Sequence, residues 1–393
     1  MLLSTKILFI IIVIMISLQI FKFQLYLILI FNRGIINPDK TWWKINDIVL
    51  NKHDFTNFIK SYENGLYIKN IFGYDIIIVN KIEDVINLLN NSPKRYKRGN
   101  IKYNFLQKMM KYNIGIEYDT NKWFNLRKQN EYVLTTQYIK SDIILLLNNN
   151  IINICNTIEK YDSFEKFNDL AKKITKLILF GHIDVSDDIF SIIETPSYFT
   201  MNSDNKNNHY MILRNIIKNT DINKNSLLNK FSEITDIMTD TSLDQIPHWI
   251  FPIYNSIILT LPRLIKIDSY YNNNTSVRNK ILEIVRLYNQ VVTLFRLDSE
   301  TNKEYLIFIQ MFLRNNKYFQ NPHAYNPKRW ENKNLEYEYY SLMFSQGPQI
   351  CPGKNIILHL LEILFENIKD KFYSPINLDI NDLPDGINPF TFF

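Results

Sequence analysis

The stretch "FSQGPQICPGKN", residues 344–355, decides the fold of this 393-residue chain. It contains Cys351, one of only two cysteines, which lies between Gly347 and Gly353 and directly ahead of a proline. A lone cysteine is usually a small, buried, apolar residue that packs. A cysteine in a glycine-containing loop with an apolar helical pattern behind it also suits a thiolate that binds a metal-containing group. The loop alone leaves both interpretations open, so the rest of the sequence has to separate them.

The spacing F-x-x-G-x-x-x-C-x-G fits a thiolate that serves as the axial ligand of a flat macrocycle. Gly347 and Gly353 would let the backbone approach the ring and adopt unusual dihedral angles. Backbone N–H groups of the loop would bond the sulfur and tune its electron donation. The next stretch, "KNIILHLLEILFENI", predicts a helix whose positive end stabilises the thiolate, and Phe344 would shield the sulfur from water.

Three further motifs accompany the loop. In "ILEIVRLY", residues 281–288, Glu283 and Arg286 are three positions apart, so one helical turn places them on the same face, where they can pair. "YNPKRW" (325–330) carries an arginine two positions after a proline, and "WFNLR" (123–127) has a tryptophan four positions before an arginine. Each of these motifs alone occurs in many proteins. Their order along the chain, ending with the cysteine loop, is far more specific.

Together the motifs resemble those of the cytochromes P450, and the resemblance covers roughly residues 40–393. It implies the cytochrome P450 fold, which is mainly α with a minor β-sheet. It also implies haem b as the cofactor, with Cys351 as the axial ligand of the haem iron. The loop residues that the resemblance places against the haem are Phe344, Gly347, Gln349 and Gly353.

The resemblance also implies roles for side chains outside the loop. Glu283, Arg286 and Arg329 would form a charge network that locks the scaffold behind the haem loop. The side chains expected to reach the haem propionates are Trp123, Arg127 and Arg296. The chain departs from the family at Gln349, because a histidine or arginine often binds a propionate at that position.

A larger departure lies in "HWIFPIYNSIILT", residues 248–260, which stands where the family carries an acid and a threonine over the haem. This stretch and the cysteine loop look most like those of a bacterial subset of the family. Tyr254 replaces the acid, so Asn255 and Ser256 are the candidates for a proton relay. Thr260 is interpreted as a packing residue. We expect Pro252 to kink the helix and expose a carbonyl that orients a water.

The sequence pattern predicts mostly helix with a few strands. Residues 65–80 read as two strands around a turn, and residues 81–91 as a short amphipathic helix. A mostly helical region follows over 121–250, interrupted at 201–210 by a polar stretch that we expect to be a loop or a connection between helices. The C-terminal residues 374–393 look strand-like.

The N-terminus predicts a membrane anchor. Residues 7–21 and 25–31 are mostly apolar, and the whole span 7–31 is about 25 residues long, enough for a helix that crosses a bilayer. No small-residue cleavage site follows, which argues against a signal peptide. We therefore predict an anchor over 1–33 and a haem domain over 34–393. Basic residues are more numerous after the apolar run, so we expect a single-pass protein with a cytosolic catalytic domain, as in the endoplasmic reticulum.

Composition, and the lack of a cofactor-binding motif for NAD(P)H, reduce the number of candidate functions. The net charge of +6 is spread along the chain without a basic stripe, so nucleic acid is not an expected partner. No dinucleotide-binding fingerprint appears, so a separate reductase or ferredoxin would bring electrons from NAD(P)H to O2 at the haem. The resemblance implies a monooxygenase acting on a hydrophobic, lipid-like substrate. A peroxide-driven or hydroperoxide-rearranging enzyme and a non-catalytic haem-binding protein remain as alternatives.

Overall fold

The computed structural model describes residues 66–374, apart from gaps at 70–74, 101, 104–106, 108–109, 136–140, 192–202, 272–273 and 292. The predicted anchor over 1–33 and the strand-like C-terminal stretch beyond residue 374 lie outside the described residues.

The described residues form one five-stranded mixed sheet in the order β1-β2-β5-β4-β3. Strands β1 and β2 pair antiparallel around residues 70–74, which confirms the predicted pair of strands, and β2 pairs in parallel with β5. The register of β3 with β4 places Arg98 directly opposite Arg296. The strand bounds are Leu66–Lys69, Asp75–Val79, Tyr96–Arg98, Thr293–Asp298 and Glu304–Phe308 for β1 to β5.

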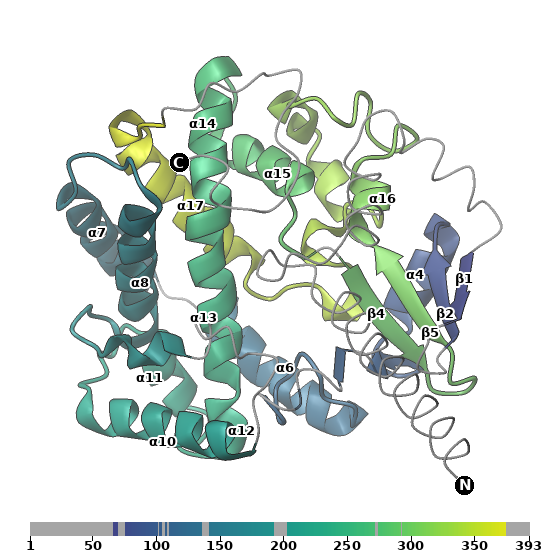
Figure 1. Cartoon of the computed structure of the whole chain (residues 1–393), viewed down its shortest axis with the longest axis horizontal. Helices are drawn as coiled ribbons and strands as arrows, with labels where there is room; N and C mark the ends of the chain where they lie inside the picture. Colours follow the sequence, from purple (N-terminus) through teal and green to yellow (C-terminus); the bar gives the residue numbers. More distant parts are fainter. Residues whose placement is uncertain are drawn as a thin grey trace, which may run out of the picture.

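Helices make up most of the rest, as the sequence predicts. The bounds are α4 Ile82–Asn90, α6 Thr120–Leu134, α7 Ser141–Asn156, α8 Phe164–Phe180, α10 Ser203–Asn219, α11 Leu227–Ser232, α12 Asp240–Leu243, α13 Gln245–Asn255, α14 Leu261–Tyr271, α15 Val277–Leu287, α16 Ile309–Leu313 and α17 Lys354–Ile368. In Figure 1, α13 and α14 form a long rod through the middle, with α7 and α8 on one side and the sheet on the other.

The long rod is the central helix of the core. It runs from α12 through α13, a π-helical turn at Ser256–Thr260 and α14. Pro252 lies inside α13 and has no N–H to donate to the preceding turn, and the wide π turn follows within one helical turn. Of the described residues, only the run Asp240–Tyr271 is long and apolar enough to cross a membrane, and most of it is buried inside the protein.

Local sequence signals explain some helix ends. Helix α8 begins after Ser163, whose hydroxyl accepts from the Lys166 N–H, and ends at Gly181, which adopts a left-handed conformation with φ of 84°. The polar stretch at 201–210 is different: α10 begins at Ser203, so the expectation of a loop there is wrong. Its last residue, Tyr210, is buried and donates to Asp244 at the start of the central helix, so tertiary packing makes this polar stretch helical.

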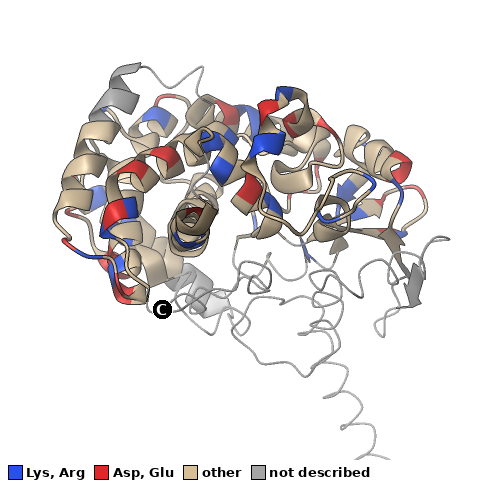
Figure 2. Ribbon diagram, turned by 90° about the horizontal axis from the view of Figure 1, so that it is seen from above, with Lys and Arg blue, Asp and Glu red and all other residues tan. Residues whose placement is uncertain are grey.

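One continuous apolar cluster joins the sheet, the central helix and the helices around it. Helix α17 packs against α7, α14 and α15, so the stretch that begins directly after the cysteine loop lies in the middle of the core. Charges of both signs are interspersed over the described ribbon (Figure 2).

Candidate active site

The cysteine loop is a closed turn that ends in a helix. The Cys351 N–H donates to the Phe344 carbonyl at 2.8 Å, and α17 begins at Lys354. Burial raises the pKa of the Cys351 thiol, while the N–H groups of Gly353 and Lys354 bond the sulfur and act in the opposite direction. The expected helix behind the cysteine and the expected N–H donors are therefore present.

The Cys351 side chain is accessible and yet closely surrounded by protein atoms. These atoms surround it closely enough for burial to dominate its pKa. The same combination occurs at Arg98 and His248: both side chains are partly accessible, yet burial lowers their pKa values to about 10 and about 4. Arg98, His248 and Cys351 are thus polar side chains that neighbouring atoms surround without covering completely.

The two loop glycines differ in backbone conformation and in how closely other residues approach them. Gly347 has φ of 69°, and a Cβ there would lie 2.8 Å from the Leu89 carbonyl oxygen at the end of α4. Gly353 has an ordinary φ of −84°, and the nearest side chain to its Cβ position is 4.0 Å away. The prediction of unusual dihedrals is confirmed for Gly347 and wrong for Gly353. Close packing against α4, as well as the left-handed backbone, requires glycine at 347.

Glu283 is the centre of a buried charge network. Its carboxylate accepts from Arg286 Nε at 2.9 Å and Nη2 at 2.8 Å, and both side chains are fully buried. Arg329 Nε lies 3.1 Å from both carboxylate oxygens. Trp330 Nε1 and the Asn326 N–H each donate to the carboxylate at 2.9 Å. Because Arg286 also donates to three backbone carbonyls, the network ties α15 to the segment that precedes the cysteine loop.

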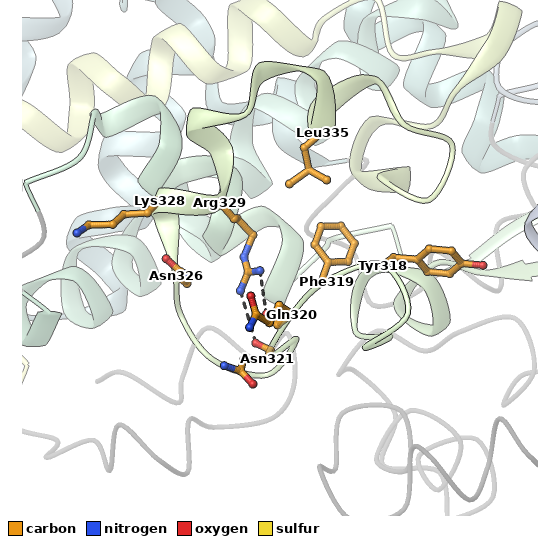
Figure 3. A pocket seen from close by; sticks show the side chains of 8 residues that line it. All are labelled: Tyr318, Phe319, Gln320, Asn321, Asn326, Lys328, Arg329 and Leu335. Atoms are coloured by element: carbon orange, nitrogen blue, oxygen red, sulfur yellow. Dashed lines mark hydrogen bonds between the residues drawn. The ribbon is translucent and has the colours of Figure 1, made fainter.

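A surface pocket lies on the outer side of this network. It is lined by Tyr318, Phe319, Gln320, Asn321, Asn326, Lys328, Arg329 and Leu335. The Arg329 guanidinium points into the loop below it and donates to the carbonyls of Gln320 and Asn321 (Figure 3). The guanidinium is engaged by the scaffold, so we assign this pocket no part in catalysis.

Two cations, the buried Arg296 and the partly accessible Arg98, lie opposite each other, and no carboxylate among the described residues pairs with either. Arg98 and Arg296 face each other across β3 and β4, and burial lowers the pKa of both guanidinium groups. For Arg296, the positive charge of Arg98 lowers the pKa further. Arg296 donates to Ser92 Oγ and to the Phe295 carbonyl. Its Nη2 has no partner among the described residues, and neither has Arg98 Nε. Buried cations of this kind need an anion. Two carboxylates of a haem would supply it.

Other buried polar groups near the loop also lack partners. Trp123 Nε1 and both amide atoms of Gln349 have no partner in the described part of the chain, although both side chains are buried. Arg127 differs, because its Nε pairs with Glu131 at 2.7 Å and its Nη1 donates to the Ile350 carbonyl at 2.6 Å, directly before Cys351. Unsatisfied buried polar groups are rare in native proteins. The N–H groups without partners on Arg98, Arg296, Trp123 and Gln349 fit a bound haem whose two carboxylates would accept from some of them.

The central helix holds the polar side chains Tyr254, Asn255 and Ser256 in different surroundings. The Ser256 hydroxyl donates to the Pro252 carbonyl at 2.6 Å, so its proton is used within the central helix. Tyr254 donates to Asn168 of α8 instead of pointing towards the loop. Asn255 is half-buried and its side chain makes no hydrogen bond to the described residues. The Ser256 hydroxyl therefore has no free proton in this arrangement, and the relay role of Asn255 stays a prediction.

Sequence reasoning missed two residues of this region. Arg98 belongs to no motif, and only the β3–β4 register shows that it faces Arg296. Gln290 follows the Glu283–Arg286 helix and donates to the central helix at Ser256 and Thr260. No signal in the sequence marks either residue, because both depend on which strands and helices become neighbours.

Comparisons with known proteins agree with the geometry. The cytochrome P450 family model matches residues 281–372, which include the Glu283 network and the cysteine loop. The fold is similar to that of a solved structure described as the haem domain of cytochrome P450DA, with a TM-score of 0.61 and 12% sequence identity. The similarity covers 84% of this chain and 88% of that one. No curated protein matches the sequence.

Proposed function

Since this chain belongs to the cytochrome P450 family, we propose that it is a haem-thiolate monooxygenase that inserts one oxygen atom of O2 into a hydrophobic substrate. The observation that carries the proposal is the set of buried polar atoms without partners on Arg98, Arg296, Trp123 and Gln349 around the Cys351 loop. Haem b, when bound, supplies the oxidising chemistry, with electron donation from a thiolate ligand.

The chain's own residues would do three things for this chemistry. Cys351 would bind the iron as a thiolate, which the Gly353 and Lys354 N–H groups stabilise. Arg98 and Arg296 would pair with the propionates and remove the cost of two unpaired buried cations. The Glu283 network would hold the loop in one position, so that the ligand needs no rearrangement.

The electron source and the substrate belong to the same proposal. We propose a separate reductase or ferredoxin that draws on NAD(P)H, because the chain carries no dinucleotide fingerprint of its own. Apolar residues 7–31 support a membrane anchor with a cytosolic catalytic domain, and a body at a bilayer favours lipid-like substrates.

A hydroperoxide-driven enzyme is the second candidate. It is favoured by Tyr254, which stands where the family has an acid and is bonded to Asn168 of α8. Chemistry that starts from an existing O–O bond needs no acid to protonate dioxygen.

One experiment tests the haem-thiolate assignment. The reduced protein with CO should show the strongly red-shifted Soret band of a thiolate ligand. Cys351→Ala should abolish that band. The matched control is Cys155→Ala, because Cys155 is a buried thiol of α7 whose pKa burial raises to about 12. A normal band in the Cys351 variant would reject the assignment. Product formation from a lipid panel, with reductase and NADPH or with hydroperoxide, then separates the two candidate functions.

A further inference from the structure

We propose that Lys354 makes the haem iron easier to reduce by holding a positive charge beside the Cys351 thiolate, and that Glu336 is the counter-ion that limits this effect. The proposal rests on the proposed function and specifies which side chains of this chain tune the haem potential. The sequence motifs assign no role to either side chain. Glu336 belongs to the 3-10 turn Lys333–Tyr337, and Lys354 is the first residue of α17.

The two side chains form an ion pair that is largely buried. Lys354 Nζ lies 2.8 Å from Glu336 Oε1, and each side chain is only 10% exposed. The Arg278 guanidinium of α15 lies 3.2 Å from the same carboxylate oxygen, but its side chain is 37% exposed. Salt and water screen an exposed charge much more than a buried one. The pair of Lys354 with Glu336 is therefore the part of this cluster that keeps its electrostatic strength.

Lys354 contacts the cysteine loop through its backbone and through its side chain. Its backbone N–H bonds the Cys351 sulfur, as the N–H of Gly353 also does. Its ammonium lies 5.6 Å from the centre of the Phe344 ring and 5.0 Å from that of Tyr337, within the range of a cation–π contact. The Phe344 carbonyl in turn accepts the Cys351 N–H at 2.8 Å. The ammonium is thus held beside the loop that presents the thiol.

The segment that carries Glu336 is attached to the loop by a second contact. Gln346, two positions after Phe344, is buried. Its side-chain amide donates at 3.0–3.3 Å to three backbone carbonyls, those of Glu336, Glu338 and Ser341. This attachment does not depend on the ion pair. Removal of either charge should therefore leave the segment in place, so that an effect of charge can be separated from a loss of packing.

The charge of Lys354 acts on the sulfur. Burial raises the pKa of the Cys351 thiol, and the positive charges of Arg127 and Lys354 act in the opposite direction. A cation that favours a negative charge on the sulfur also favours a more negative charge on the iron that the sulfur binds. Net charge and hydrogen bonds around a ligand sulfur are among the means by which a protein sets the potential of a bound metal group.

The step that these two residues affect is the reduction of ferric to ferrous iron. One electron passes from the separate donor to the iron, no bond is broken, and no proton is transferred. The ferrous form has one more negative charge than the ferric form. The positive charge of Lys354 therefore favours reduction, and the negative charge of Glu336 beside it opposes reduction.

The test is a reductive titration of the haem-loaded full-length protein with dithionite. Lys354→Met removes the positive charge and keeps an unbranched stem, and Arg278 still pairs with Glu336. We expect this variant to shift the ferric–ferrous equilibrium about three- to tenfold towards ferric, or about 30–60 mV for one electron. Glu336→Gln keeps the shape of the side chain and should shift the equilibrium by a similar factor towards ferrous. The double variant should return towards the parent, because it removes both charges.

A second ion pair at the far end of the same helix provides the matched control. Lys369 pairs with Glu366, and these side chains are 37% and 49% exposed. Helix α17 has 15 residues and is about 22 Å long, about twice the distance over which 0.1 M salt screens exposed charges. Lys369→Met and Glu366→Gln should therefore keep the parent potential. Lys354→Arg keeps a positive charge and should restore most of the parent value.

Several results would overturn the proposal. They are parent-like potentials in both Lys354→Met and Glu336→Gln, shifts of both variants in the same direction, or equally large shifts in the control pair. Failure of both variants to bind haem would make the pair structural and would also reject the tuning role. A parent protein without the thiolate CO band would instead reject the proposed function. The two failures are therefore distinguishable.

Discussion

Replacing Glu283 by glutamine removes the charge at the centre of the scaffold network and keeps the volume of the side chain. In the native protein the carboxylate accepts from Arg286, Arg329, Trp330 and the Asn326 N–H. An amide of the same shape presents one oxygen and two N–H groups. The N–H groups would point at guanidinium donors and leave Arg286 buried without a counter-charge.

The cost follows from burial. The Glu283 and Arg286 side chains have no exposed surface, and Arg329 is 8% exposed. Breaking a buried pair by removing one partner typically costs about 3–5 kcal/mol, because the remaining charge is uncompensated. A domain is stable by only about 5–15 kcal/mol. Glu283→Gln should therefore remove a large share of the free energy of unfolding and lower the fraction of protein that binds haem.

Urea unfolding of parent and variant measures the difference, and the haem content after purification measures its consequence. Asp169→Asn is the matched control, because Asp169 pairs with Lys173 on the surface of α8, where the two side chains are 49% and 33% exposed. Exposed pairs contribute less than about 1 kcal/mol, so this variant should unfold like the parent. A Glu283→Gln protein within about 1 kcal/mol of the parent would refute the reasoning.

Two further predictions concern buried cations and histidines. Arg98→Leu should weaken haem binding about ten- to a hundredfold, because one charge-assisted hydrogen bond is lost, and the rate of haem release measures this effect. The same change should stabilise the haem-free protein, because it removes a like charge opposite Arg296, and thermal melting of the haem-free protein measures this second effect. Burial lowers the pKa of His209 from 6.5 to about 4, so the unfolded chain binds a proton at a higher pH than the folded protein does. The free energy of unfolding should therefore fall as the pH drops from 6.5 to about 4. Urea unfolding over this pH range should show a weaker pH dependence for His209→Leu than for the parent.

Much of the fold could be predicted because local rules decide it. The hydrophobic pattern predicted the first pair of strands and helices such as α4, and Gly181 marks the end of α8. The one clear error, at 201–210, came from reading polarity as a loop, whereas α10 is held by its contact with the central helix. Propensity is a weak signal when tertiary packing opposes it.

For the site, too, the features that could be predicted from the sequence are those that depend on residues close together in the chain. The spacing of Glu283 and Arg286 determines by itself that their side chains share a helix face, and the sequence around Cys351 determines that a helix begins behind the thiol. Both features depend only on residues that lie within one or two helical turns of each other in the sequence. The sequence therefore supplied the family resemblance and the candidate ligand without any knowledge of the fold.

Tertiary structure alone decided which distant residues meet. The pairing of β3 with β4 brings Arg98 opposite Arg296, and the packing of the segment after α15 against the π turn brings Gln290 to Thr260. Tertiary packing also directs the Ser256 hydroxyl to the Pro252 carbonyl and the Tyr254 hydroxyl to Asn168 of α8. Contacts between segments far apart in sequence depend on strand register and helix packing. No spacing along the chain encodes them.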